Sequence, residues 1–392
     1  RMNRILEIDY ENRCVVVQPG VTNASVTSAV AAAGFYYAPD PSSQIACTIG
    51  GNVAENSGGI HCLKYGLTTQ NLIGVELTLM SGKRLKLGGK HAGDGGLDLL
   101  SVVCGSEGLL GVVTEATLRI LPRPPATKTA MLAFNTVRAA GETVAALIGA
   151  GIIPAALEFM DRRCIAVVEA FCAPGYPPGA EAILIAEVDG MPAEAADDMR
   201  RIAEIASGLG ATAIRECESE AERARVWSGR KAAFGAMGRI EPDILCMDGT
   251  IPRKKLPDVL EAISEFSDQY GLVCCNVFHA GDGNLHPLIG FDCMRGNELE
   301  RAEAFGADIL KLCVRMGGVL TGEHGVGVEK KALMGEMFSE TDLAQQERLK
   351  CAFDGAGLLN PGKVFPTLHA CVELGHMHVH GGRLPFPNLP RM

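Results

Sequence analysis

The stretch Leu272-Val273-Cys274-Cys275-Asn276-Val277-Phe278, followed at once by His279-Ala280-Gly281-Asp282-Gly283-Asn284-Leu285-His286, decides the fold of the second half of the chain. Its first seven residues are mostly apolar and predict a buried strand. The following Gly-Asp-Gly-Asn run excludes a helix, because it is dense in turn-forming residues. A strand that ends in such a loop predicts a reversal of the chain with a histidine on each side.

The two histidines are candidate metal ligands. If Gly281 to Asn284 reverse the chain, His279 and His286 are directly opposed and point to one side. That geometry suits two imidazoles on one divalent metal ion. Asp282 is interpreted as a turn former rather than as a ligand. Nine histidines in the chain make a chance pair the alternative, but the glycine-flanked frame favours a functional role.

A second cluster, Thr321-Gly322-Glu323-His324-Gly325-Val326-Gly327, follows the apolar pair Val319-Leu320. Glu323 would complete a set of three ligands with the two histidines. Such a set leaves coordination positions open for a substrate, as catalytic metal sites require. His324 would then be free to act as a base.

Working outward from this segment, longer helices alternate with strands, which is typical of an α+β domain. The residue pattern predicts one further strand and three helices here, the first of them amphipathic. These are the strand 182–188 and the helices 193–209, 259–270 and 301–316.

The first part of the chain shows shorter elements between glycine-rich turns. We expect a strand at 15–17, a helix at 22–33 that ends at Gly34, a hairpin of 71–80 with 83–87, and a strand at 112–120. The segment Leu121-Pro122-Arg123-Pro124-Pro125 cannot continue sheet or helix. We place a domain boundary there.

Two glycine-rich stretches have the composition of a cofactor cradle. They are 39–59, with Thr48-Ile49-Gly50-Gly51-Asn52 at its centre, and 105–114. Glycine lets backbone N–H groups approach a phosphate or a flat ring without an obstructing Cβ. The alternative, that both are ordinary glycine-bearing loops, stays open. Neither is a GxGxxG that opens a helix after a strand, which disfavours a nicotinamide cofactor.

Composition excludes several functions. The net charge of -10 argues against a nucleic-acid partner. No apolar run is long enough for a transmembrane helix. The 14 cysteines include no CxxC pair, which argues against iron–sulfur and structural zinc sites and indicates a reducing, cytoplasmic location.

With both clusters in view, the chain resembles the FAD-linked oxidase family of D-lactate and D-2-hydroxyglutarate dehydrogenases, and within it the FAD-linked subunits of glycolate oxidases. The resemblance extends over essentially the whole chain, and HxGDGNxH with GEHGVG is highly specific. The matching stretches are 48–66, 105–118, 277–287, 320–327 and 359–363.

The resemblance implies an α+β fold in two parts. The C-terminal part of a vanillyl-alcohol-oxidase-type (PCMH) FAD-binding domain would occupy residues 1–122. A ferredoxin-like α+β FAD-oxidase C-terminal domain, which holds substrate and metal, would occupy 123–366. An extended tail would occupy 367–392.

The resemblance also implies the roles of individual residues. His279, His286 and Glu323 would bind a divalent metal ion (Zn, Mn or Fe), and His324 would be the catalytic base. Arg230 would bind the substrate carboxylate, because a guanidinium fork is the natural partner of a carboxylate. A solvated helix arginine is the alternative for Arg230. The FAD would be lined by Pro39, Ser42, Thr48, Ile49, Gly50, Gly51, Ala54, Asn56, Gly59, Gly108, Val113 and Asn360.

Two features depart from the family or lie outside its motifs. The family's FAD domain begins with a further subdomain that holds the pyrophosphate. We expect this subdomain to be missing, because the chain opens almost at once into an apparently interior strand, Cys14–Val17, with no element before it. In the tail, His376, His378 and His380 could form a second metal site, but the prolines that follow favour a packing or interface role.

The function implied is FAD-dependent oxidation of a small 2-hydroxy acid, glycolate or D-lactate, to the 2-oxo acid. The electrons would pass to an iron–sulfur subunit and a second flavin subunit of a glycolate oxidase complex, and on to quinone. We expect a cytoplasmic protein, with a peripheral place at the inner membrane as a variant. The alternatives are a non-catalytic or FAD-deficient subunit of such a complex, and a metal-dependent hydrolase without flavin.

Overall fold

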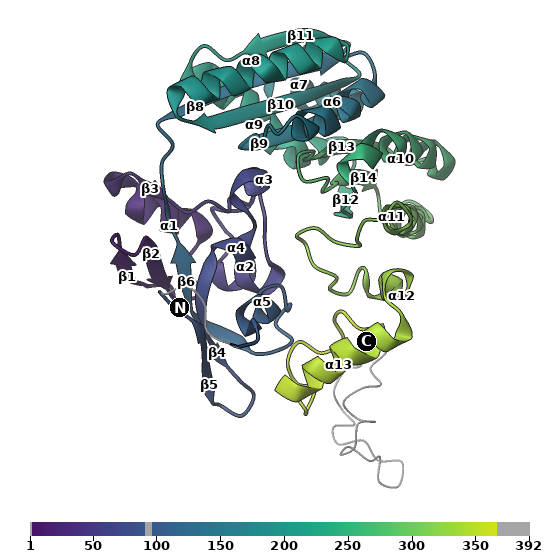
Figure 1. Ribbon diagram of the computed structural model, residues 1–392. Coiled ribbons are helices and arrows are strands. Elements are labelled where there is room, and N and C mark those ends of the chain that lie inside the picture. The colour runs from purple at the N-terminus through teal and green to yellow at the C-terminus, as the bar shows by residue number, and fades with distance from the viewer. Residues whose placement is uncertain (1, 91–95, 367–392) are drawn as a thin grey trace.

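The computed structural model describes residues 2–90 and 96–366 and shows two units, each built on its own antiparallel sheet (Figure 1). The main sheet of the N-terminal unit has five strands in the order β1-β2-β6-β4-β5, and the sheet of the C-terminal unit has seven in the order β11-β8-β10-β9-β13-β14-β12. The predicted tail and its three histidines lie outside the described residues.

The strands of this five-stranded sheet are β1 (Ile5–Asp9), β2 (Cys14–Val17), β4 (Leu72–Thr78), β5 (Arg84–Gly88) and β6 (Val112–Arg119). The unit's helices are α1 (Asn23–Val30), α2 (Ile49–Glu55), α3 (Cys62–Tyr65), α4 (Thr68–Asn71) and α5 (Leu99–Val103). The predicted hairpin is confirmed as β4–β5, with Thr78 opposite Arg84. The predicted helix ends in a short 3-10 turn, Ala31–Ala33, and then Gly34 at φ 79°.

Two predictions for this unit were wrong. A strand does precede Cys14–Val17: β1 pairs with β2 along its length, and β2 is interior because β6 lies on its other side. The proline segment also contributes to a sheet, because β7 (Leu121–Pro122) pairs with β3 (Phe35–Tyr36). A proline is compatible with this position because both strands of a two-stranded sheet are edge strands.

The C-terminal unit begins with the strand order of a ferredoxin-like fold. Its first four strands are β8 (Ala126–Phe134), β9 (Ala156–Asp161), β10 (Ala182–Gly190) and β11 (Ala211–Glu216). These strands lie in the order β11-β8-β10-β9, and a helix follows each of β8 and β10. This is the antiparallel βαββαβ arrangement. One additional helix, α7, lies between β9 and β10. Three more strands extend the sheet beyond β9: β13 (Cys274–His279), β14 (Pro287–Phe291) and β12 (Asp243–Cys246).

Helices cover both faces of this sheet. One face packs against α6 (Val137–Gly149), α8 (Pro192–Gly208), α10 (Leu256–Tyr270) and α11 (Glu298–Arg315), and the other against α7 (Arg162–Cys172) and α9 (Glu220–Met237). Side chains of β8 alternate between the two cores, as a strand's period of two requires: Leu132 and Phe134 face the first, Met131 and Ala133 the second. Sequence analysis predicted three of these helices within a few residues of their ends.

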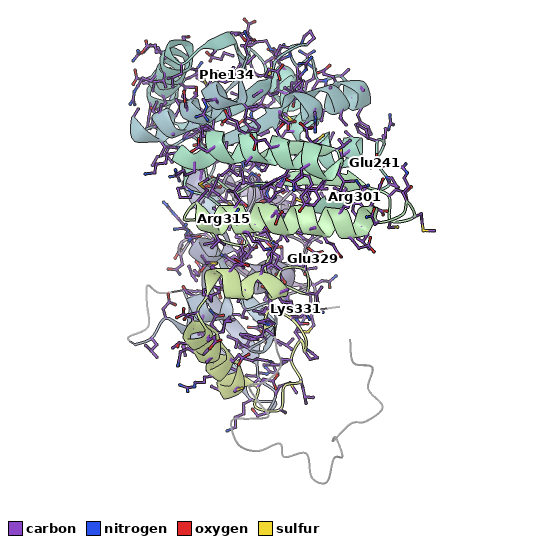
Figure 2. All side chains as sticks on the ribbon, turned by 90° about the vertical axis from the view of Figure 1, so that its right-hand side faces the viewer. Phe134, Glu241, Arg301, Arg315, Glu329 and Lys331 are labelled. Carbon is purple, nitrogen blue, oxygen red and sulfur yellow. The ribbon has the colours of Figure 1, made fainter. Side chains whose placement is uncertain are left out.

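The chain then returns to the N-terminal unit. In Figure 2, α11 crosses the molecule with Arg301 near one end and Arg315 at the other, and the helices α12 (Met334–Met337) and α13 (Glu340–Phe353) lie beyond it. Lys350 of α13 donates to the carbonyl of Leu109 at 2.8 Å. Phe353 packs against the core of β4, β5 and α5. The segment 319–327, between α11 and α12, is thereby held between the two units.

Candidate active site

The β13–β14 hairpin presents both candidate histidine ligands. His279 is the last residue of β13, and His286 directly precedes β14. Asn276 pairs with Pro287, and His279 pairs with Asn284 across the loop. The predicted direct opposition of His279 and His286 was therefore wrong by two residues. A shift of two keeps both side chains on one face, and the two rings meet edge to face with centroids 5.0 Å apart.

Glu323 completes the cluster. Its Oε1 lies 2.9 Å from His286 Nε2 and 3.3 Å from His279 Nε2. The backbone N–H of Gly58, in the N-terminal unit, donates to its Oε2 at 3.0 Å. Although burial opposes ionisation, the hydrogen bonds from the two imidazoles lower the pKa of Glu323 well below its usual value. The carboxylate is thus an anion that both units fix in place.

These three residues fit a divalent cation. One donor atom from each lies within 4.8 Å of the other two, and two imidazoles with one carboxylate are the donors that zinc, manganese and iron accept. A second set of donors, Cys246, His286 and His324, shares His286. Burial raises the pKa of the Cys246 thiol well above its usual value. The first set is the more buried of the two and includes a carboxylate that is held as an anion, so it is the better site.

Asp248 organises the loop that carries Glu323 and His324. Its Oδ2 accepts the backbone N–H groups of Gly322, Glu323 and His324 at 3.0, 2.7 and 2.7 Å. Its Oδ1 accepts from Lys330 Nζ, and both groups are buried. Burial alone would raise the pKa of Asp248, but the Lys330 ammonium outweighs it and the pKa is lowered.

Arg230 lies on α9 and is only 3% exposed. Its Nε donates to Glu158 Oε2 at 2.6 Å, and Glu158 Oε1 accepts from His279 Nδ1 at 2.7 Å. The alternative of a solvated helix arginine is therefore wrong. In the part of the chain that the structure describes, this guanidinium pairs with a carboxylate on one side only, and its other side is suited to hold an anionic ligand.

Both predicted catalytic residues, Arg230 and His324, line one cavity of about 290 Å³. His324 is the more accessible of the two, with a side chain 43% exposed, and its ring stacks on His286 with centroids 5.1 Å apart. The cavity is lined by Pro41, Ser42, Ser43, Ser57, Gly59, Arg230, Phe234, His279, His286, Glu323 and His324.

A separate cleft of about 570 Å³ collects most residues predicted to bind the cofactor: Thr48, Gly50, Gly51, Ala54, Gly108, Val113 and Asn360. At Gly108, which has φ 71°, a Cβ would lie 3.9 Å from Asn360, an ordinary van der Waals distance, so the backbone there is not crowded. Gly50 is different, because a Cβ there would meet Pro19. The open, glycine-lined wall fits an extended cofactor such as FAD.

Other predicted cofactor residues lie elsewhere. Ser42 and Gly59 line the catalytic cavity rather than the cleft. The Ile49 side chain is fully buried in the core of the N-terminal unit, so only its backbone could face a ligand. Pro39 is buried, and its carbonyl accepts from Asn23 at 3.0 Å. Asn56 ends α2 and accepts the N–H of Thr69 at 2.9 Å.

Sequence reasoning missed three carboxylates that support the site. Glu158 and Asp248 were recognisable only as acidic residues in or next to apolar runs. Glu107 accepts the N–H groups of Val326 and Gly327 at 2.7 and 2.8 Å and so ties the glycine-rich stretch 105–114 to the GEHGVG loop. No local pattern reveals these pairings, since each partner is distant in sequence.

The fold and the paired cleft and cavity define an FAD-dependent oxidoreductase whose FAD-binding domain is of the vanillyl-alcohol-oxidase (PCMH) type. Two solved structures have this fold. A 4-ethylphenol oxidase from Gulosibacter chungangensis superposes with a TM-score of 0.75 at 18% identity, covering 93% of this chain and 79% of that one. A p-cresol methylhydroxylase gives 0.74 at 17%, covering 93% and 78%.

Sequence comparison then gives the family. The profile "FAD linked oxidases, C-terminal domain" matches residues 123–364, and "FAD binding domain" matches 1–88. Glycolate oxidase subunit GlcD of Escherichia coli (strain K12) is 52% identical over 391 residues, 100% of this chain and 78% of that protein. A D-lactate dehydrogenase of Archaeoglobus fulgidus is 31% identical, covering 93% and 80%. The chain belongs to the FAD-linked oxidases.

Proposed function

We propose that the protein oxidises a small D-2-hydroxy acid, glycolate or D-lactate, to the corresponding 2-oxo acid. The observation that carries the proposal is the single cavity that contains Arg230, the His279–His286–Glu323 cluster and His324. A carboxylate-binding cation, a metal site and a base are the three groups that this oxidation needs. The names of two relatives, a glycolate oxidase subunit and a D-lactate dehydrogenase, agree with this chemistry.

Two bound groups would supply the rest. The backbone around Gly51 and Gly108, together with Asn360, would hold FAD along the glycine-lined cleft, and FAD would supply the hydride acceptor. A divalent cation held by His279, His286 and Glu323 would supply Lewis acidity to the substrate's oxygens.

The residues of the chain bind the substrate and move its proton. Arg230 pairs with the substrate carboxylate through the terminal nitrogens that Glu158 leaves available. His324 takes the hydroxyl proton as C2 gives up its hydrogen. Asp248 holds the backbone of His324, which keeps the imidazole at the wall of the cavity. Loss of one proton and one hydride converts the hydroxy acid into the 2-oxo acid.

The electrons need an acceptor, which is either an external molecule or a partner subunit. We infer that an iron–sulfur subunit and a second flavin subunit receive the electrons and pass them to quinone. The sequence holds no CxxC pair for an iron–sulfur cluster of its own. In addition, the Escherichia coli relative is named as a subunit. Within residues 2–90 and 96–366 no helix is both long and apolar enough to cross a bilayer. We propose a cytoplasmic location, with a peripheral place at the inner membrane as a variant.

The test is anaerobic reduction of the FAD-loaded protein, followed by the visible flavin bands. Glycolate or D-lactate should bleach them. Flavin that stays oxidised with both acids would support the non-catalytic alternative, and a metal-binding protein without flavin would support a hydrolase.

A further inference from the structure

A single buried carboxylate joins the metal cluster to the substrate arginine. The side chain of Glu158 is 0% exposed, and its two oxygens have different partners. Oε1 lies 2.7 Å from His279 Nδ1, and Oε2 lies 2.6 Å from Arg230 Nε. The two residues that it contacts belong to different elements and have different proposed roles.

The pairing of strands determines this position. β13 lies antiparallel to β9, and His279 is the direct partner of Glu158 in that register. Residues that face each other in this way have their side chains within contact distance on one face. That face is covered by α9, which brings Arg230 to the other oxygen. The two hydrogen bonds of Glu158 form a bridge between His279 and Arg230. This bridge is therefore a consequence of the sheet order and not of side-chain rotation alone.

The bridge restricts what each partner can do. A histidine that binds a metal is neutral. If neutral His279 donates its Nδ1 hydrogen to Glu158, its Nε2 carries the lone pair and faces Glu323. This is the nitrogen that a metal ion on the cluster would use. Because the Nε hydrogen of Arg230 is bound by Glu158, the planar guanidinium is fixed about its axis. Its terminal nitrogens are then available at the cavity wall.

We propose that Glu158 is a positioning residue that sets the His279 tautomer and the Arg230 orientation together, and so couples metal affinity to substrate affinity. This inference rests on the proposed function, since it takes His279 as a ligand and Arg230 as the carboxylate partner. Outer partners of metal-bound histidines commonly orient the ring in this way. Here the same carboxylate would also orient the group that binds the substrate.

The test compares Glu158→Gln with the wild type as FAD-loaded proteins. A glutamine has one acceptor oxygen and one NH₂ group, so it cannot accept from both His279 and Arg230. We expect the affinity for Zn²⁺ or Mn²⁺, measured by competition with a chelator on metal-depleted protein, to fall by about 10- to 100-fold. The KM for D-lactate should rise in the same variant by a larger factor than kcat falls.

Glu187→Gln is the matched control. Glu187 is also a buried glutamate of this sheet (2% exposed), and it binds Arg223 Nη2 at 2.8 Å and Trp227 Nε1 at 2.8 Å. It does not contact the cluster. The control should lose stability without a change in metal affinity. If Glu158→Gln does not fold, Glu158→Asp keeps the charge but is too short for both partners, and it should show the same paired losses at smaller size.

The outcomes separate the two levels of the proposal. If the wild type binds no metal or its flavin is not reduced by either acid, the proposed function fails. If the wild type binds metal and its flavin is reduced, the proposed function stands. The coupling role of Glu158 is then contradicted by a folded Glu158 variant that keeps its metal affinity. It is also contradicted by a variant that loses metal affinity while its KM is unchanged.

Discussion

Asp248 is the residue on which the geometry of the Glu323–His324 segment depends. It is fully buried, and it balances the charge of buried Lys330 while accepting three consecutive backbone N–H groups. Removing one member of a buried, hydrogen-bonded pair leaves the other charge without compensation. This costs more than the pair contributes when intact.

Replacing Asp248 with asparagine should therefore destabilise the protein and slow flavin reduction together. We expect a loss of about 3–5 kcal/mol in the free energy of unfolding, measured by denaturant titration. The rate of flavin reduction by D-lactate should fall, because the His324 backbone loses its anionic acceptor.

Asp161→Asn is the control for buried aspartates in general. Asp161 caps α7 by accepting the N–H of Cys164 at 2.8 Å, and it also accepts from Asn276. This variant should lose stability at an unchanged rate of flavin reduction. An Asp248→Asn protein that reduces its flavin at the wild-type rate would show that the anion does not hold the base.

At the scale of elements, the β13–β14 hairpin carries the site, and its loop depends on Gly283. This residue has φ 73°, and a Cβ there would lie against the carbonyl oxygen of Ile251, closer than real Cβ atoms come. That carbonyl belongs to the segment after β12, so the loop and the neighbouring chain pack backbone to backbone. The N–H of Ile251 also donates to the Gly283 carbonyl at 2.9 Å.

Gly283→Ala should cost about 3 kcal/mol or more, because backbone strain and a backbone clash add together. Gly82→Ala is the matched control: Gly82 has φ 77° with open space around it, and its replacement should cost only about 1 kcal/mol of strain. Thermal unfolding measures both. The metal affinity should fall only in Gly283→Ala, and equal losses of stability in the two variants would contradict the role of the close contact.

The hairpin also shows what sequence reasoning can reach. A strand, a reversing loop and two histidines on one face were predictable, because local composition determines them. The exact register was not, since it depends on where β14 pairs. Glu158 could not be found at all, because its place opposite His279 requires the pairing of β9 with β13 across more than a hundred residues. Arg230 and the cofactor residues came from family resemblance, and the structure assigned Ser42 and Gly59 to the cavity instead of the cleft.

At the scale of the whole molecule, the two units meet through a charged contact beside the cavity. The imidazole of His61, in the N-terminal unit, contacts two carboxylates. Its Nδ1 lies 2.8 Å from Asp40, and its Nε2 lies 3.3 Å from Glu187 of β10. Lys64 and Tyr65 both bind Asp189 of the same strand. Asp40 directly precedes Pro41 and Ser42, which line the cavity.

The stability of the protein should therefore depend on the charge of His61. Burial opposes this charge, but Asp40 and Glu187 outweigh it and raise the pKa of His61 well above 6.5. Because the folded state holds the proton more tightly, the stabilisation is fully present below the unfolded pKa and is lost as the pH rises through the folded pKa. Urea unfolding at about pH 6 and about pH 9 should show this loss in the wild type and a smaller loss in His61→Gln. Identical pH profiles would exclude His61 as the group responsible.

The measurement that tests the central claim most directly is the anaerobic rate of flavin reduction in the wild type and in His324→Ala, each loaded with FAD and metal. We predict that D-lactate or glycolate bleaches the wild-type flavin, and that His324→Ala does so about 10²- to 10⁴-fold more slowly while it still binds FAD and metal. A variant that reduces its flavin as fast as the wild type would contradict the assignment of this cavity as the place where the substrate loses its proton.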